Sequence, residues 1–213
     1  MSLQQKFSKL RNLKGKVLLV VFSIIIIIIS SLGKNISKKA IKNPTDKDSK
    51  DTILRNEKIS QFSLGLGSGF LLYTLMSNFI HPVKIAFIGI LLGAMSGITI
   101  NSFGKLNDDE NCKDKIQETY GVMYGIMGTA CGMILAGLIV TGLEKVSGRG
   151  KITPFVILGI FMCVINIFLC SININTANNS KNIGKGSSIG LLVVSILALI
   201  GSVAFLVKTG GKL

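Results

Sequence analysis

The sequence predicts an all-α integral membrane protein, a six-transmembrane helical bundle with glycine-rich helix packing and no sizeable soluble domain. The chain has 213 residues, is 48% hydrophobic and has a mean hydropathy of +0.58, which is high for a soluble domain. Its apolar residues form long uncharged runs, and about 20 apolar residues suffice for a helix to cross a bilayer. The runs lack the period-two alternation of β-strands, so we predict helices.

The first 58 residues contain one predicted span with a polar segment on each side. Residues 1–16 carry five basic residues and no acid, and they are interpreted as either an amphipathic surface helix or a simple basic flank. Residues 17–32 include six consecutive isoleucines and are predicted to be a signal anchor, with a cleaved signal peptide as the alternative. Residues 33–58 are expected to be a polar linker, because Pro44 and many charged residues disfavour packed structure.

Residues 59–207 are predicted to form a five-helix membrane bundle, followed by a short basic tail at 208–213. His81 and Pro82 leave so short a connection that the second and third spans must form an antiparallel hairpin. Six spans place both termini on one side. That side has 11 basic residues and the other has 13, so the positive-inside rule does not decide the orientation. The predicted spans of the bundle are 59–80, 83–103, 120–143, 152–172 and 188–207.

Glycine is concentrated inside the predicted spans and indicates how the helices pack. Glycine in a membrane helix is costly unless it allows another backbone to come close. Four of the six glycines of the span 120–143, Gly121, Gly125, Gly128 and Gly132, fall within an arc of about 60° at 100° per residue, which is a glycine-zipper pattern. From such stripes we predict these helix-packing residues: Gly89, Gly93, Gly97, Gly121, Gly125, Gly128, Gly132, Gly159 and Asn166.

The same small-residue stripes are also compatible with a polar pathway across the membrane. Apart from Lys84 at the start of one span, the spans contain no ionisable residue other than cysteine and tyrosine, and coupled transporters usually need one at membrane depth. Ion-coupled transport is therefore disfavoured. A passive pore built by the glycine-lined helices is the alternative hypothesis.

Catalytic and metal-binding patterns are missing from the sequence. His81 is the only histidine, so no Cys/His zinc spacing exists. The glycines at 65–69 resemble a phosphate-binding loop only faintly and lie inside a span, so we interpret them as packing glycines. We expect no enzymatic activity, no catalytic residue, no metal and no cofactor.

Two cysteines are predicted to lie on the side opposite the termini. Cys112 follows the third span and Cys170 is near the end of the fifth. They would form a disulfide if that side is lumenal or extracellular, and would be two free thiols otherwise.

The composition limits the functional classes and the partners. The basic residues lie in the short polar segments, which fits contact with the lipid bilayer and its anionic headgroups and excludes a nucleic-acid-binding domain. Lysine outnumbers arginine 21 to 3 and isoleucine occurs 31 times, as in an AT-rich genome. We expect a structural, scaffolding or assembly role in a virion membrane or host endomembrane, with an organelle membrane as the alternative. Homo-oligomers, a passive channel or permease, and an accessory subunit of a membrane complex are the other hypotheses.

Overall fold

The computed structural model of the chain describes residues 3–41, 47–104, 113–147, 153–178 and 184–209. Each of the six helices in these ranges contains a segment long and apolar enough to cross a membrane, which confirms the predicted fold class. The protein is therefore a multi-pass integral membrane protein. The helices are α1 (Leu3–Ile41), α2 (Lys47–Met76), α3 (Pro82–Gly104), α4 (Lys113–Ser147), α5 (Thr153–Asn178) and α6 (Lys185–Thr209).

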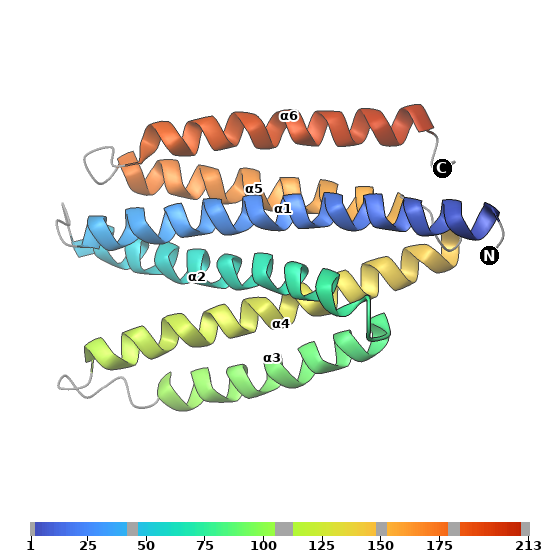
Figure 1. The fold of residues 1–213 in the computed structure, drawn as a ribbon. Coiled ribbons are helices and arrows are strands. Elements are labelled where there is room, and N and C mark those ends of the chain that lie inside the picture. The colour runs from blue at the N-terminus through green and yellow to red at the C-terminus, as the bar shows by residue number, and fades with distance from the viewer. Residues whose placement is uncertain (1–2, 42–46, 105–112, 148–152, 179–183, 210–213) are drawn as a thin grey trace.

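The helices lie side by side in the order α6, α5, α1, α2, α4, α3, and each contacts the next in this row (Figure 1). Consecutive helices run in opposite directions, so α1 begins and α6 ends at the same end of the molecule. We call this the terminal end, and we call the end where α1 finishes and α2 begins the loop end. α4 is tilted and also contacts α5 with its C-terminal half.

Burial follows a seven-residue repeat on the inner helices. On α1, Phe22, Ile29 and Ile36 are spaced by seven residues and are nearly inaccessible. On α5, Met162, Leu169 and Thr176 have the same spacing and burial. A repeat of 3.5 residues per turn is typical of left-handed packing with side chains inserted between those of the neighbouring helix. Because α1 and α5 run in the same direction, they form a parallel pair inside the row.

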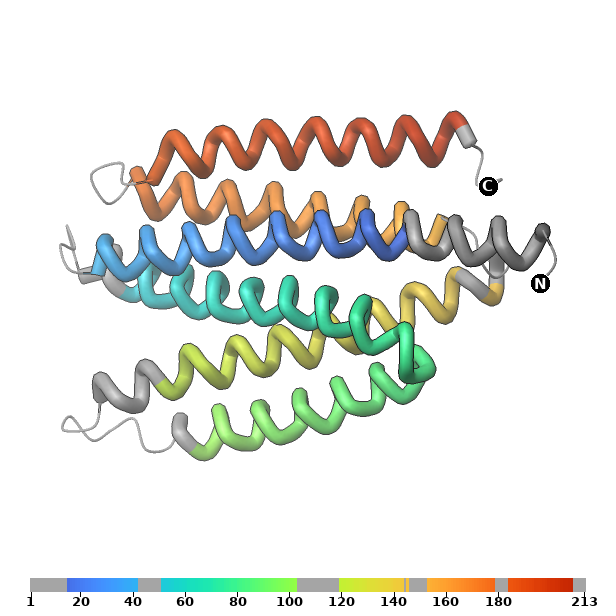
Figure 2. The backbone as a smooth tube through the Cα atoms, in the orientation of Figure 1, coloured from blue at the N-terminus to red at the C-terminus, as the bar shows by residue number. Residues whose placement is uncertain are grey.

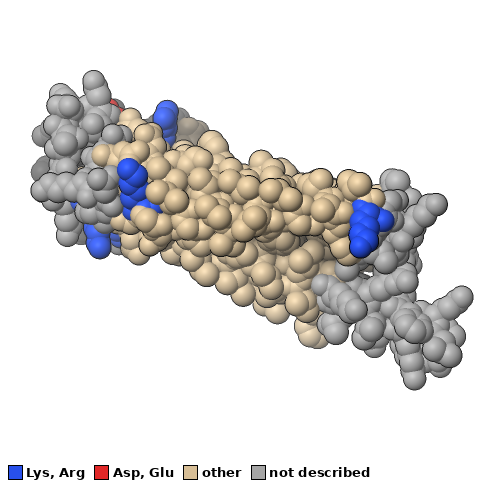
Figure 3. All heavy atoms as spheres, turned by 90° about the horizontal axis from the view of Figure 1, so that it is seen from above, with Lys and Arg blue, Asp and Glu red and all other residues tan. Residues whose placement is uncertain are grey.

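The two outer helices contribute little buried surface. In the apolar window of α6 only 6% of residues are buried, and in that of α3 22%, against 50% in α2 and α5. Their outward side chains are large and apolar, as expected for contact with lipid. The face in Figure 3 has Lys and Arg only near the two ends, with an uncharged band between them.

The prediction of a polar linker at 33–58 is wrong, because most of this segment is helical. α1 continues to Ile41 and α2 begins at Lys47, and Figure 2 shows α1 without interruption through this region. The reason is an amphipathic pattern: Ile36, Ala40 and Ile53 are buried, whereas Lys38, Lys39 and Lys58 are exposed. At 1.5 Å per residue the 39 residues of α1 extend about 58 Å, well beyond a hydrocarbon core of about 30 Å.

Other helices also extend beyond the spans that the sequence predicts. The basic segment 1–16 is continuous with the first span from Leu3 onward, so α1 includes both. The span expected at 120–143 is part of a helix that begins at Lys113 and ends at Ser147. The basic tail expected at 208–213 starts inside α6, which ends at Thr209.

Candidate functional site: the helix-packing contacts

Four glycines bring the backbones of α2 and α4 into contact. A Cβ atom at Gly65 would meet the carbonyl oxygen of Gly125, and one at Gly69 would meet that of Thr129. From the other side, a Cβ at Gly128 would meet the carbonyl oxygen of Phe62. No side chain fits at these positions without moving a backbone. We call Gly65, Gly69, Gly128 and Gly132 the glycine seam.

The seam follows from helix geometry. Residues four apart lie on the same face, so Gly65 and Gly69 on α2 form one flat strip, and Gly128 and Gly132 on α4 form the opposing one. A Cβ at Gly132 would lie 2.5 Å from the carbonyl oxygen of Leu66 and 3.0 Å from the Cα of Gly69. The backbones can approach this closely only because none of the four residues has a side chain.

Helix α2 uses glycine on both faces because it lies between α1 and α4. Gly67 is rotated by about 200° from Gly65, so it faces the other neighbour. A Cβ at Gly67 would lie 2.9 Å from a side-chain carbon of Ile27 and 3.1 Å from the carbonyl oxygen of Ser23, both on α1. The cluster at 65–69 thus joins three helices.

The other predicted packing glycines divide into tight and loose positions. A Cβ at Gly89 would lie 2.9 Å from the carbonyl oxygen of Ala130, and one at Gly159 would lie 2.7 Å from the ring of Phe22. A Cβ at Gly121 would lie 3.2 Å from the Gln61 amide. The loose positions are Gly93 and Gly125, with ordinary contacts of 3.5 and 3.8 Å, and Gly97, with nothing within 4 Å.

Sequence reasoning did not single out Gly65, Gly69 or Gly33 as partners in these contacts. Gly33 faces the side chains of Asn173 and Ser60, where a Cβ would overlap both. The signal that could have found Gly65 and Gly69 is their spacing of four residues, which matches the spacing of Gly128 and Gly132.

A buried polar cluster joins α1, α2 and α5 toward the loop end. Asn56 donates a hydrogen bond of 2.6 Å from Nδ2 to the hydroxyl of Thr176, and Asn173 donates one of 3.1 Å to the carbonyl oxygen of Ile29. Both asparagines are at most 5% exposed. Hydrogen bonds between membrane helices contribute about 0.6 kcal/mol on average. This cluster therefore fixes the register of three helices.

Most buried hydroxyls bond to their own helix. Ser23 donates to the carbonyl oxygen of Leu19, and Ser195 donates to that of Leu191, each four residues earlier. Such bonds remove the hydroxyl from the surface that a solute would contact. Within the described residues, Asn166 Oδ1 and Ser30 Oγ are buried without a hydrogen-bond partner.

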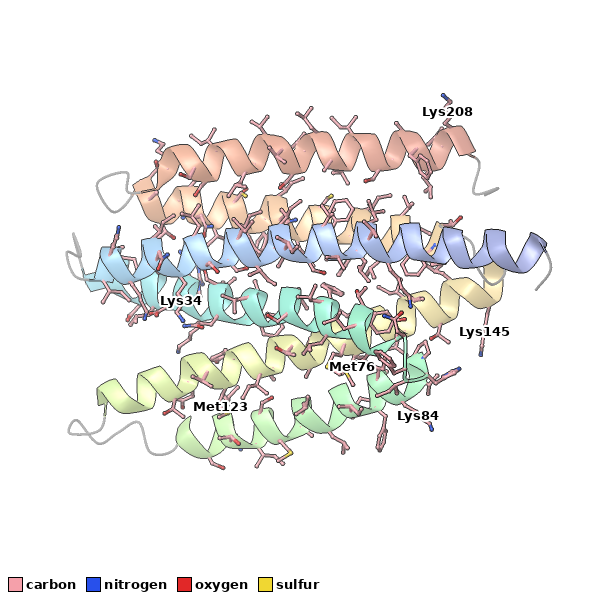
Figure 4. The ribbon with its side chains drawn as sticks, in the orientation of Figure 1. Lys34, Met76, Lys84, Met123, Lys145 and Lys208 are labelled. Atoms are coloured by element: carbon pink, nitrogen blue, oxygen red, sulfur yellow. The ribbon has the colours of Figure 1, made fainter. Side chains whose placement is uncertain are left out.

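Two lysine side chains make contacts between helices near the loop end. The Lys58 ammonium lies 5.6 Å from the ring centroid of Tyr120 and 6.0 Å from that of Tyr124. These are cation–π distances, and they join α2 to the start of the α4 span. Lys34, labelled in Figure 4, donates a 3.3 Å hydrogen bond to Gln61 of α2.

The remaining candidate residues do not assemble a reactive centre in the described part of the chain. His81 is exposed, and its Nδ1 accepts a 3.4 Å hydrogen bond from the Val83 amide at the start of α3. No three His, Cys, Asp or Glu side chains converge there. Cys163 and Cys170 are buried free thiols, and Cys112 lies outside the described residues, so its pairing with Cys170 stays a prediction.

Comparisons of the chain with protein-family models, with curated proteins and with solved structures find no match. Functional inference therefore rests on the packing contacts themselves.

Proposed function

We propose that this protein is a structural component of a membrane, with a scaffolding or assembly role and no catalytic or transport cycle. The observation that carries the proposal is the glycine seam, where α2 and α4 touch backbone to backbone at Gly65, Gly69, Gly128 and Gly132. Contacts of this kind favour one rigid arrangement. A transporter, by contrast, needs helices that rearrange around a binding site.

The buried hydroxyls support the same proposal. Ser23, Thr74 and Ser195 bond to carbonyl oxygens of their own helices, so they offer no continuous row of free polar groups to a solute. The charged side chains of the described helices lie outside the uncharged run within each helix. Proton relays and ion-coupled carriers use ionisable groups at membrane depth.

A passive channel is the second candidate function. It is favoured by Ser30 Oγ and Asn166 Oδ1, two buried polar atoms on the paired helices α1 and α5 that have no partner among the described residues. A polar passage between these helices would satisfy both atoms. The AT-rich codon bias favours a virion membrane or a host endomembrane as the setting for either function.

Reconstitution distinguishes the two candidates. The full chain is placed in planar bilayers for conductance and in vesicles for electron cryo-microscopy. A structural role predicts baseline conductance together with protein arrays or a changed vesicle shape at high protein-to-lipid ratio. Discrete channel openings that Asn166→Leu abolishes would refute the structural proposal in favour of the channel. Vesicles of unchanged shape without arrays would contradict the scaffolding role as well.

A further inference from the structure

Two apolar grooves meet on the C-terminal half of α4, near the terminal end. The groove between α4 and α5 has a volume of about 470 Å³ and is lined by Leu138, Gly142, Ile157 and Phe161, among others. The groove between α3 and α4 has a volume of about 310 Å³. Leu138 and Gly142 line both, so the two grooves flank one ridge of α4.

Gly142 keeps this region open. A Cβ at Gly142 would have no atom within 4 Å, whereas one at Gly137 would lie 3.1 Å from both the Ala86 side chain and the Pro82 carbonyl oxygen. The helices α3 and α4 thus touch at Gly137 and leave space at Gly142. Grooves of this size with apolar walls suit a hydrocarbon chain.

The cationic side chains at the grooves are Lys84 and Lys145. Lys145 lines the α3–α4 groove together with Thr141, whose Oγ1 is buried without a partner among the described residues. Lys84 lines the adjoining groove, which shares Val83 with this one. Figure 4 shows Lys84 and Lys145 at the terminal end, and both are exposed.

The charge of the terminal end matches an anion. By sequence, the segments that flank this end carry eleven Lys or Arg residues and one acid, Glu144. The segments that flank the loop end carry thirteen basic and nine acidic residues. The excess positive charge is therefore concentrated on the side of Lys84 and Lys145, where it attracts anionic headgroups.

We infer that this surface is a binding site for one anionic glycerophospholipid. An acyl chain lies along the α4 ridge in the grooves around Leu138 and Gly142. The phosphate group lies at the terminal end, where the exposed ammonium groups of Lys84 and Lys145 neutralise it. A zwitterionic lipid fills the same grooves but leaves the lysine charges uncompensated.

Fluorescence quenching tests the site, because the chain contains no tryptophan. Phe161→Trp places a single reporter in the α4–α5 groove, and Leu138→Trp provides a second reporter if the first variant misfolds. Full-length protein is reconstituted in phosphatidylcholine vesicles with brominated phosphatidylglycerol or brominated phosphatidylcholine of the same acyl chains. Phe205→Trp on α6 is the matched control, since Phe205 has a similar exposure of 41% against 40% for Phe161.

We expect stronger quenching by brominated phosphatidylglycerol at Phe161→Trp and equal quenching by both lipids at Phe205→Trp. Lys84→Gln with Lys145→Gln should lower the preference roughly fivefold per lysine, the scale of one basic residue near an anionic surface. Gly142→Leu should reduce quenching by filling the groove. Equal quenching by the two lipids at Phe161→Trp, or a preference that survives the double lysine variant, would overturn the proposal.

Discussion

At the residue scale, the absence of a side chain is what positions α2 against α4. The glycine seam lets carbonyl oxygens of one helix contact the backbone of the other, and each such contact is lost if the helices separate. A glycine with open space around it, such as Gly97, contributes nothing to this contact. Two glycines in similar sequence patterns can thus differ completely in their effect on stability.

We predict that Gly128→Leu lowers the free energy of unfolding by about 3 kcal/mol or more, because the new side chain would overlap the backbone of Phe62 and Leu66. Gly65→Leu should act similarly, since it faces Gly125 and Thr129. The measurement is thermal unfolding followed by maleimide reaction of the buried thiols Cys163 and Cys170 in a background with Cys112→Ser and Cys131→Ser.

Gly97→Leu and Gly142→Leu are the matched controls for the seam. Neither position has an atom within 4 Å of an added Cβ, so each variant should unfold within about 0.5 kcal/mol of the parent. If all four leucine variants unfolded at the same temperature as the parent, α2 and α4 would not pack through these glycines.

A second prediction at this scale concerns the buried hydrogen bond between Asn56 and Thr176. In a double-mutant cycle with Asn56→Ala and Thr176→Val, the coupling free energy should be about 0.6 kcal/mol and favourable. Ser171, exposed on the same helix, gives the control cycle of Asn56→Ala with Ser171→Ala and should show no coupling. A coupling of zero in the first cycle would show that the two side chains do not meet.

At the element scale, the long apolar runs predict the number of helices and their alternating direction. They do not predict where each helix begins and ends. Between residues 33 and 58 the charges suggest a linker, yet Ile36 and Ala40 are four residues apart on α1 and buried, and Ile53 is buried on α2. α5 packs against this region, because Thr176 accepts a hydrogen bond from Asn56 and the Asn173 side chain lies against Gly33. A single sequence does not reveal a partner that is more than 100 residues away.

The sequence predicts the packing contacts only in part, because it does not show which helices are neighbours. The stripe on α4 is visible as a spacing of glycines, but which neighbour it faces depends on the spatial order of the helices. That order places α2, not the adjacent α5, against Gly128 and Gly132. Gly97 has the same spacing as Gly89 and Gly93, yet a Cβ at Gly97 would have no atom within 4 Å, whereas one at Gly89 would lie 2.9 Å from the carbonyl oxygen of Ala130.

The helical end of α1 gives a prediction at the element scale. Single cysteines placed along residues 35–40 should react with a water-soluble maleimide in a helical pattern. We expect labelling at Asn35, Lys38 and Lys39, which are exposed, and protection at Ile36, Ser37 and Ala40, which are buried. Uniform labelling across these six positions would show a linker in place of a packed helix.

At the scale of the whole molecule, the row of six alternating helices gives the membrane protein two unlike ends. Both termini lie at the end that carries the excess of positive charge, and nearly all acidic residues flank the other end. The outer helices α3 and α6 present mostly exposed apolar surface, and the inner helices hold the polar contacts. This arrangement is the basis of both the structural role and the lipid site proposed above.

The most direct test of the six-span architecture is the sidedness of single cysteines at Ser2, Ser49, Ser147 and Thr209 in a background without other cysteines. A membrane-impermeant maleimide is added to sealed vesicles of uniform protein orientation, before and after permeabilisation. The architecture predicts that Ser2, Ser147 and Thr209 react from one side and that Ser49 reacts only from the other. Labelling of Ser49 from the same side as Ser2 would contradict it.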